Sequence, residues 1–157
     1  MNEPFATDER ALRMEALYHD RLVPCYAHRP AHLDAMFRAS VQRRAQALAL
    51  EEGAYSLTYA QLDAQVGRLA AGWAARGIGR GDRVALLLGN RMDFVVALLS
   101  LWRLGAIVVP IGIRQSAAEL EYMLGQCGAC ALVFEGSLAD RLPRPDRIPG
   151  VRLFVHC

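Results

Sequence analysis

The sequence contains no lysine, because all 18 Lys+Arg positions of the 157-residue chain are arginine. A chain without lysine has no side chain that can form a Schiff base, and it has no ammonium group for a phosphate-binding loop. We therefore exclude chemistry that depends on a lysine of this chain.

Export and membrane-spanning signals are also missing. The first 20 residues mix acidic and basic side chains and have no central apolar run, so they do not resemble a signal peptide. The window Phe94–Ile113 is nearly apolar, but Arg103 lies near its centre and Gly105 and Pro110 interrupt it. Placing arginine at the centre of a bilayer costs about 2.5–3.5 kcal/mol. We expect no membrane span.

The remaining composition is that of a globular domain. The chain is 54% hydrophobic and carries a net charge of +2, which favours a packed core and gives no reason to expect a nucleic-acid partner. Four cysteines at unpatterned spacing, without an export signal, favour a reducing cytoplasm. The sequence holds no G-x-S-x-G, H-E-x-x-H or G-x-x-x-x-G-K-[ST] motif, and no catalytic set can be assembled from it.

Residues 1–31 form a loosely specified leader, which we separate from an α/β region at 32–157. A helix capped by Asp8 and running to Tyr18 is expected there, while Pro24 and Pro30 are expected to prevent regular structure. The apolar spacing after the leader predicts a helix over 33–44. A Glu-Glu-Gly turn between residues 48–50 and 55–57 predicts a small hairpin.

Helix starts and stops follow in a regular order from Thr58 onward. Thr58 with Gln61 and Ser116 with Glu119 have the spacing of capping boxes, each of which satisfies two backbone donors at a helix start. Left-handed glycine stops are expected at Gly77 and Gly105. We predict helices over 58–76, 94–104 and 116–126, buried strands over 84–88, 106–109 and 131–134, a short helix near 137–141 and a last strand near 151–155. Alternating helices and strands predict a parallel sheet with helices on both faces, a three-layer α/β fold.

The glycine-rich turn Gly77–Gly81 resembles a phosphate loop, but its position argues against that role. It follows a helix and precedes a strand, so it lies at the amino edge of the predicted sheet. Ligands of open α/β sheets bind outside the carboxyl ends of the strands. We interpret this turn as a helix stop followed by a tight turn.

Two groups of cysteine and histidine invite a metal or redox interpretation. Cys127 and Cys130 form a CxxC, but Cys127 falls at a helix C-terminus, where the dipole does not favour a thiolate. Cys25, His28 and His32 have a spacing that three metal ligands could use, but Pro30 breaks the helix that would align the histidines. We expect no metal site and interpret the CxxC cysteines as packing residues.

The strand-to-helix loops form the edge where a ligand would bind. Asn90 and Arg91 lie in one loop, and Gly112 and Arg114 lie in the next. Both arginines could meet an anion. The alternative is structural: Asn90 caps the following helix, and Gly112 turns the chain. A third loop of the same edge contains Glu135 and Gly136. The ligand-contact candidates are Asn90, Arg91, Gly112 and Arg114.

From about His32 to Val155 the sequence resembles the adenylate-forming, or AMP-binding, enzymes of the acyl-CoA synthetase family. The joint order of five motifs carries the resemblance, and it is more specific than any one of them. The motifs are LTY-x-x-L at 57–62, G-x-G-D-x-V at 79–84, L-x-N at 88–90, G-A-x-x-V-P at 105–110 and E-L-x-x-x-L at 119–124.

The resemblance implies a parent reaction in which ATP activates a carboxylate to an acyl-adenylate that is passed to coenzyme A. ATP, Mg and CoA are then cofactors of the parent, and fatty acid metabolism is its expected setting. The family's phosphate loop, adenine and ribose motifs and catalytic lysine have no matching positions in this sequence. We expect this chain alone to bind none of these cofactors, to be inactive, and to need the remainder of the parent or a self-association partner.

Two alternatives stay open at this stage. A non-catalytic docking or dimerisation module could have the same fold and use sheet surface left uncovered. A small Rossmann-type nucleotide binder is disfavoured because the glycine fingerprint between a strand and a helix is absent.

Overall fold

The computed structural model describes residues 11–157 of the chain. The chain divides into two compact units, with the boundary between Met36 and Phe37. The division at residue 31 expected from the sequence stays a prediction.

The first unit contains an antiparallel hairpin of β1 (Leu12–Tyr18) and β2 (Arg21–Tyr26). The expected helix ending at Tyr18 is therefore wrong over its described part, and Asp8 lies outside the described residues. Polar and apolar residues alternate with a period of two from Leu12 to Ala16, which favours a strand. Pro24 is tolerated because both strands of a two-stranded sheet are edge strands.

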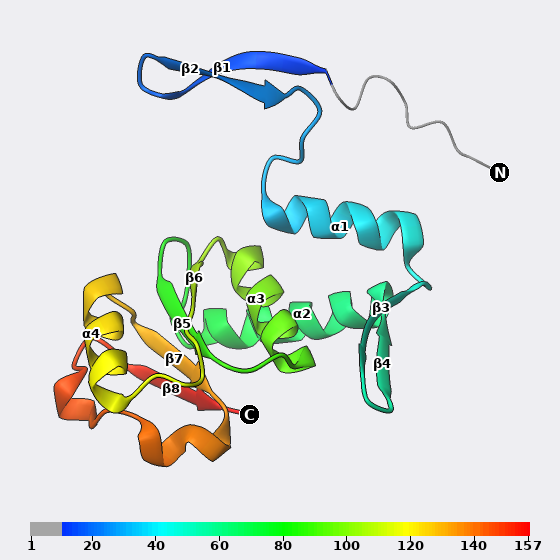
Figure 1. The fold of residues 1–157 in the computed structure, drawn as a ribbon. Coiled ribbons are helices and arrows are strands. Elements are labelled where there is room, and N and C mark those ends of the chain that lie inside the picture. The colour runs from blue at the N-terminus through cyan, green and yellow to red at the C-terminus, as the bar shows by residue number, and fades with distance from the viewer. Residues whose placement is uncertain (1–10) are drawn as a thin grey trace. The chain divides into compact units, whose positions relative to one another are not determined.

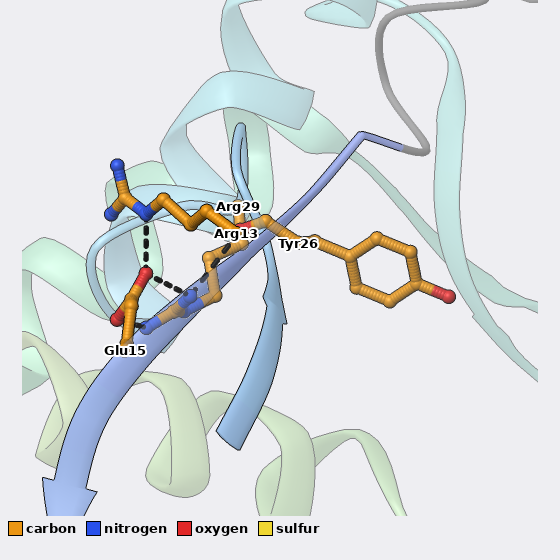
Figure 2. Close-up of polar contacts among 4 residues, drawn as sticks. All are labelled: Arg13, Glu15, Tyr26 and Arg29. Atoms are coloured by element: carbon orange, nitrogen blue, oxygen red, sulfur yellow. Dashed lines mark hydrogen bonds and ion pairs between the residues drawn. The ribbon is translucent and has the colours of Figure 1, made fainter. Parts of the chain in front are cut away.

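Charged side chains gather on one face of this hairpin (Figure 2). The Glu15 carboxylate accepts hydrogen bonds from Arg29 Nη1 at 2.9 Å and Nη2 at 2.7 Å, and a third from Arg13 Nε. Arg29 Nη1 also donates to the carbonyl of Tyr26 at 3.3 Å. The contact with Arg29, and after it that with Arg13, lowers the pKa of Glu15 to about 2.

The depressed pKa of Glu15 gives the hairpin a pH dependence of known sign. The ionised carboxylate stabilises the folded hairpin fully above its ordinary pKa of 4.5, and this stabilisation is lost as the pH falls toward about 2. We expect Arg29→Gln to raise the pKa of Glu15 toward the ordinary value, as measured by NMR titration of the carboxyl carbon. Arg21→Gln, in the same hairpin, should leave the pKa unchanged. Equal shifts in both variants would contradict the assignment of the effect to Arg29.

Helix α1 (Leu33–Arg44) begins in the first unit and ends in the second, with the bounds that the sequence predicts. His32 Nδ1 accepts a hydrogen bond from the backbone N–H of Ala35 at 3.1 Å, so the imidazole caps the start of this helix. The predicted hairpin follows as β3 (Leu48–Glu52) and β4 (Tyr55–Thr58), which pair antiparallel.

In the second unit, local signals set the starts of two helices and the end of a third. Both capping boxes are present: Thr58 with Gln61 at α2 (Tyr59–Ala75), and Ser116 with Glu119 at α4 (Ala117–Cys127). Helix α3 (Met92–Leu104) ends at Gly105, whose φ of 71° is left-handed. Side-chain caps and glycine stops act within four residues, so the sequence reveals them directly.

A four-stranded parallel sheet forms the centre of the second unit. Its strands are β5 (Arg83–Leu87), β6 (Ile107–Pro110), β7 (Ala131–Phe134) and β8 (Leu153–His156), in the order β6-β5-β7-β8. The 3₁₀ helices η2 (Gly136–Arg141) and η3 (Pro145–Arg147) connect β7 to β8. Helix α4 lies on one face of the sheet, and α2 and α3 lie on the other (Figure 1). The predicted three-layer α/β fold is confirmed.

Successive residues of the central strands enter two different cores. Ala85 and Leu87 pack toward Leu120 and Leu124 of α4, whereas Leu86 packs on the opposite face with α2 and α3. All of β7 is buried, as the apolar run predicts.

The expectation that residues 106–109 form a fully buried strand is wrong. Strand β6 lies at the edge of the sheet, and Ile107 is 46% exposed. An apolar run of four residues carries no information on whether a second neighbour strand exists, so the edge position is a property of the tertiary fold. Over the described residues, no helix is both long and apolar enough for a bilayer crossing.

Candidate functional site

The carboxyl ends of three adjacent parallel strands, β6, β5 and β7, meet at one edge of the sheet. The chain passes from β5 to β6 on one side and returns to β7 on the other. Such a reversal of strand order is where ligands of open α/β sheets bind. The loops that leave this edge contain all four candidates, Asn90, Arg91, Gly112 and Arg114.

A carboxylate of the protein bridges the loops after β5 and β7. Glu135 Oε1 accepts a hydrogen bond from the backbone N–H of Gly89 at 2.6 Å, and Ser137 Oγ lies 3.5 Å from Glu135 Oε2. A Cβ at Gly89 would lie 3.0 Å from the same Oε1, so the glycine permits the close approach. The backbone N–H of Gly89, which could otherwise bind an anion between these strands, is thus already bonded to Glu135. The negative charge of that carboxylate would also repel an anion.

A second carboxylate occupies the start of α3. Glu52 Oε2, from β3, accepts a hydrogen bond from the backbone N–H of Met92 at 2.6 Å. The N-cap residue is Arg91, which makes no side-chain cap. The expectation that Asn90 caps this helix is therefore wrong, because the cap comes from a residue 40 positions earlier. A negative charge at a helix N-terminus is favourable, and here the protein itself supplies it.

Asn90 and Arg91 line an open cavity of about 250 Å³ between β3 and the start of α3. Arg91 is paired with Asp93 on the first turn of the helix, with Nη2 and Oδ2 2.9 Å apart. Glu51 and Glu52 line the same cavity. The cavity therefore combines one paired guanidinium with two carboxylates, which is a poor arrangement for a polyphosphate.

Gly112 and Arg114 belong to a different part of the edge and do not line that cavity. Arg141 holds their loop by donating to the carbonyls of Ile113 at 3.0 Å and of Gln115 at 2.9 Å. A Cβ at Gly112 would lie 3.0 Å from Gln115 Oε1, which shows a tight turn. Arg114 is exposed. The structure thus places the four candidates on one edge without bringing them into one site.

The glycine turn at residues 77–81 has the structural role that its position predicts. Gly77 and Gly81 adopt left-handed φ values of 77° and 85°. The N–H of Gly79 donates to Asp82 Oδ2 at 2.9 Å, and Arg152 Nη2 donates to the carbonyl of Gly77 at 3.2 Å. The donors of this turn are used internally, at the amino edge of β5.

The two cysteines of the CxxC motif face different cores, although they are only three residues apart. Cys127 packs with the α4 side of the sheet and Cys130 with the α2–α3 side. Both thiols are free, and burial raises the pKa of Cys130. These placements support the interpretation of both as packing residues. Within residues 11–157, no cluster of three or more His, Cys, Asp or Glu side chains has the geometry of a metal site.

The sequence placed Glu135 in a loop of this edge but did not reveal its contact with Gly89, and it did not identify Glu52 at all. Glu52 is separated from its partner by 40 residues and Glu135 by 46. The only local signal was that Gly89 begins a strand-to-helix turn in which backbone donors require acceptors.

The family model described as AMP-binding enzyme matches residues 37–152. A medium/long-chain-fatty-acid–CoA/3-oxocholest-4-en-26-oate–CoA ligase of Mycobacterium marinum is 39% identical over 110 residues, covering 69% of this chain and 20% of the ligase. The long-chain-fatty-acid–CoA ligase FadD13 of Mycobacterium tuberculosis is 37% identical over 97 residues, covering 62% of this chain and 19% of that ligase. The chain thus spans about a fifth of the length of the curated relatives it matches.

Solved structures of two such relatives superpose on this chain. The N-terminal domain of FACL13 from Mycobacterium tuberculosis superposes with a TM-score of 0.76 at 28% identity, covering 80% of this chain and 33% of that one. Apo MbtA of Mycobacterium smegmatis superposes with a TM-score of 0.75 at 34% identity, covering 82% of this chain and 24% of that one.

Proposed function

Because this chain belongs to the AMP-binding enzyme family, we propose that it forms the amino-terminal scaffold of a carboxylate-activating ligase. The parent reaction joins a carboxylic acid to coenzyme A at the expense of ATP, in the cytoplasm. The similarity to fatty-acid–CoA ligases supports a medium- or long-chain fatty acid as the substrate. In this proposal residues 32–157 are the α/β scaffold, and residues 1–31 precede it.

The observation that carries the scaffold role is the use of backbone donors at the carboxyl edge. The N–H groups of Gly89 and Met92 are both bonded to carboxylates of the chain. Two nearby guanidiniums are also engaged, Arg91 with Asp93 and Arg141 with two carbonyls, whereas Arg114 is exposed in a separate part of the edge. A nucleoside triphosphate needs free donors and cations for its phosphates. The residues at this edge do not fit ATP, so we assign no step of the reaction to them.

A free-standing docking module was the alternative function. The match of the family model to residues 37–152 does not favour it, because the match covers most of the second unit. No observation on the ligand edge supports it either.

Hydroxamate formation tests both parts of the proposal. We expect the chain alone, given ATP, Mg and a medium- or long-chain fatty acid, to form no hydroxamate above a no-protein blank. The FadD13 ligase of Mycobacterium tuberculosis is the positive control. ATP-dependent product from the chain alone would refute the scaffold role.

A chimeric ligase tests whether this chain can serve as the scaffold of an active enzyme. Residues 37–152 of this chain would replace the matching segment of the FadD13 ligase. We expect hydroxamate formation within about tenfold of the unmodified ligase, a loss of no more than about 1.4 kcal/mol in transition-state stabilisation. A chimera that melts cooperatively but is inactive would contradict the proposed function.

A further inference from the structure

The hairpin of the first unit has two chemically different faces. Its register pairs Leu12 with Tyr26, Met14 with Pro24, and Ala16 with Leu22, and beyond a bulge it pairs Tyr18 with Arg21. Cross-strand partners project to the same face of a sheet, and alternate residues of a strand share a face. One face, called here the apolar face, therefore consists entirely of uncharged and mainly apolar residues, namely Leu12, Met14, Ala16, Leu22, Pro24 and Tyr26.

The opposite face carries the charges. Arg13, paired with Cys25, and Glu15, paired with Val23, alternate with the residues of the apolar face. Figure 2 shows the ring of Tyr26 directed away from the Glu15 carboxylate and the two guanidiniums that contact it. On this face Arg13 is exposed, whereas Glu15, Val23 and Cys25 are partly buried.

The apolar face is the more exposed of the two, although apolar side chains are usually buried and charged ones exposed. Leu12 is 62% exposed, Met14 59%, Leu22 60% and Tyr26 58%. Ala16 and Pro24 are exposed as well. A two-stranded hairpin is at best marginally stable in water and needs a packing surface. A contiguous apolar face of this kind marks an interaction site.

We propose that the apolar face packs against the same face of a second copy of this chain. The face carries no charge, so bringing two identical faces together around a two-fold axis costs no like-charge repulsion. A lipid surface is the less suitable partner, because membrane-binding faces are bordered by free basic residues. Arg13 and Arg29 are on the other side and bonded to Glu15, and Arg21 is a single exposed arginine at the turn end of the hairpin, beyond the bulge.

The size of the face is sufficient for a weak dimer. Side chains of these exposures present on the order of 500 Å² per copy, or about 1,000 Å² for two copies. That is near the lower limit for a specific interface, so we expect a dissociation constant of roughly 10–100 µM. The proposal does not depend on the ligase function.

Sedimentation velocity of the full chain between about 5 and 200 µM, concentrations that bracket this constant, tests the proposal. We expect a monomer–dimer equilibrium that Met14→Arg shifts toward the monomer by at least about tenfold in dissociation constant. Tyr122→Glu is the matched control, because Tyr122 is 69% exposed on α4, and it should leave the equilibrium unchanged. A wild-type chain that stays monomeric at the highest concentration would overturn the proposal, as would a dimer that Met14→Arg does not weaken.

Cross-linking keeps the test valid if Met14→Arg unfolds the hairpin. In a background with the four cysteines replaced by serine, Met14→Cys and Arg13→Cys place single thiols on opposite faces of β1. A short bis-maleimide should join two copies through position 14 and not through position 13. Equal cross-linking at both positions, or at neither, would show that the apolar face is not the contact.

Discussion

Leu132→Ala should lower the free energy of unfolding by about 2–5 kcal/mol. Leu132 is fully buried in β7, an interior strand of the sheet, where it pairs with Ala85 of β5 and Phe154 of β8. Removing three carbon atoms from a site enclosed by two neighbouring strands and α4 leaves a cavity that cannot easily collapse. Urea unfolding followed by far-UV circular dichroism measures the loss.

Ile107→Ala is the matched control for this variant. Ile107 lies on the edge strand β6 and is 46% exposed, so we expect a loss below about 1 kcal/mol. The two residues belong to runs that look equally apolar in the sequence. A loss at Ile107 as large as that at Leu132 would contradict the strand order with β6 at the edge.

Ser100→Ala should destabilise the protein by about 1–3 kcal/mol, although it removes a single oxygen atom. The Ser100 hydroxyl is fully buried in α3, accepts from Trp73 Nε1 at 3.0 Å and donates to the carbonyl of Ala97 at 2.7 Å. Trp73 is 2% exposed. Without the hydroxyl, the indole N–H loses its acceptor where water cannot replace it, so the full desolvation cost remains.

A double-mutant cycle separates this hydrogen bond from packing. Trp73→Phe removes the indole N–H while the Ser100 hydroxyl retains Ala97 as its acceptor. We expect the double variant to be less destabilised than the sum of the two single variants by about 0.5–2 kcal/mol in thermal and urea unfolding. Strict additivity would show that the hydrogen bond between α2 and α3 contributes nothing to stability.

Features with a local cause could be predicted from the sequence. Thr58 and Ser116 start helices through side chains three residues away, and Gly105 stops one through its left-handed φ. Each of these interactions lies within a single turn of helix, so residue order alone is sufficient. The order of strands and helices then followed, and with it the parallel three-layer fold.

Features that depend on distant segments could not be predicted. The exposure of Ile107 depends on which strands neighbour β6. The β1–β2 hairpin differs, because the alternation from Leu12 to Ala16 is a local strand signal that the expected helix did not take into account. In the candidate site, the sequence located the correct edge and the loop that contains Glu135, but not the contacts that Glu52 and Glu135 make there. Glu52 and Glu135 reach their donors across 40 and 46 residues, and no periodicity or local motif records such contacts.

The measurement that most directly tests the scaffold role is calorimetric titration of this chain with ATP in the presence of Mg. We expect no saturable binding below about 1 mM, equivalent to less than about 4 kcal/mol of binding free energy, because Glu52 and Glu135 already occupy backbone donors at the ligand edge. Saturable binding at micromolar ATP would contradict the scaffold role.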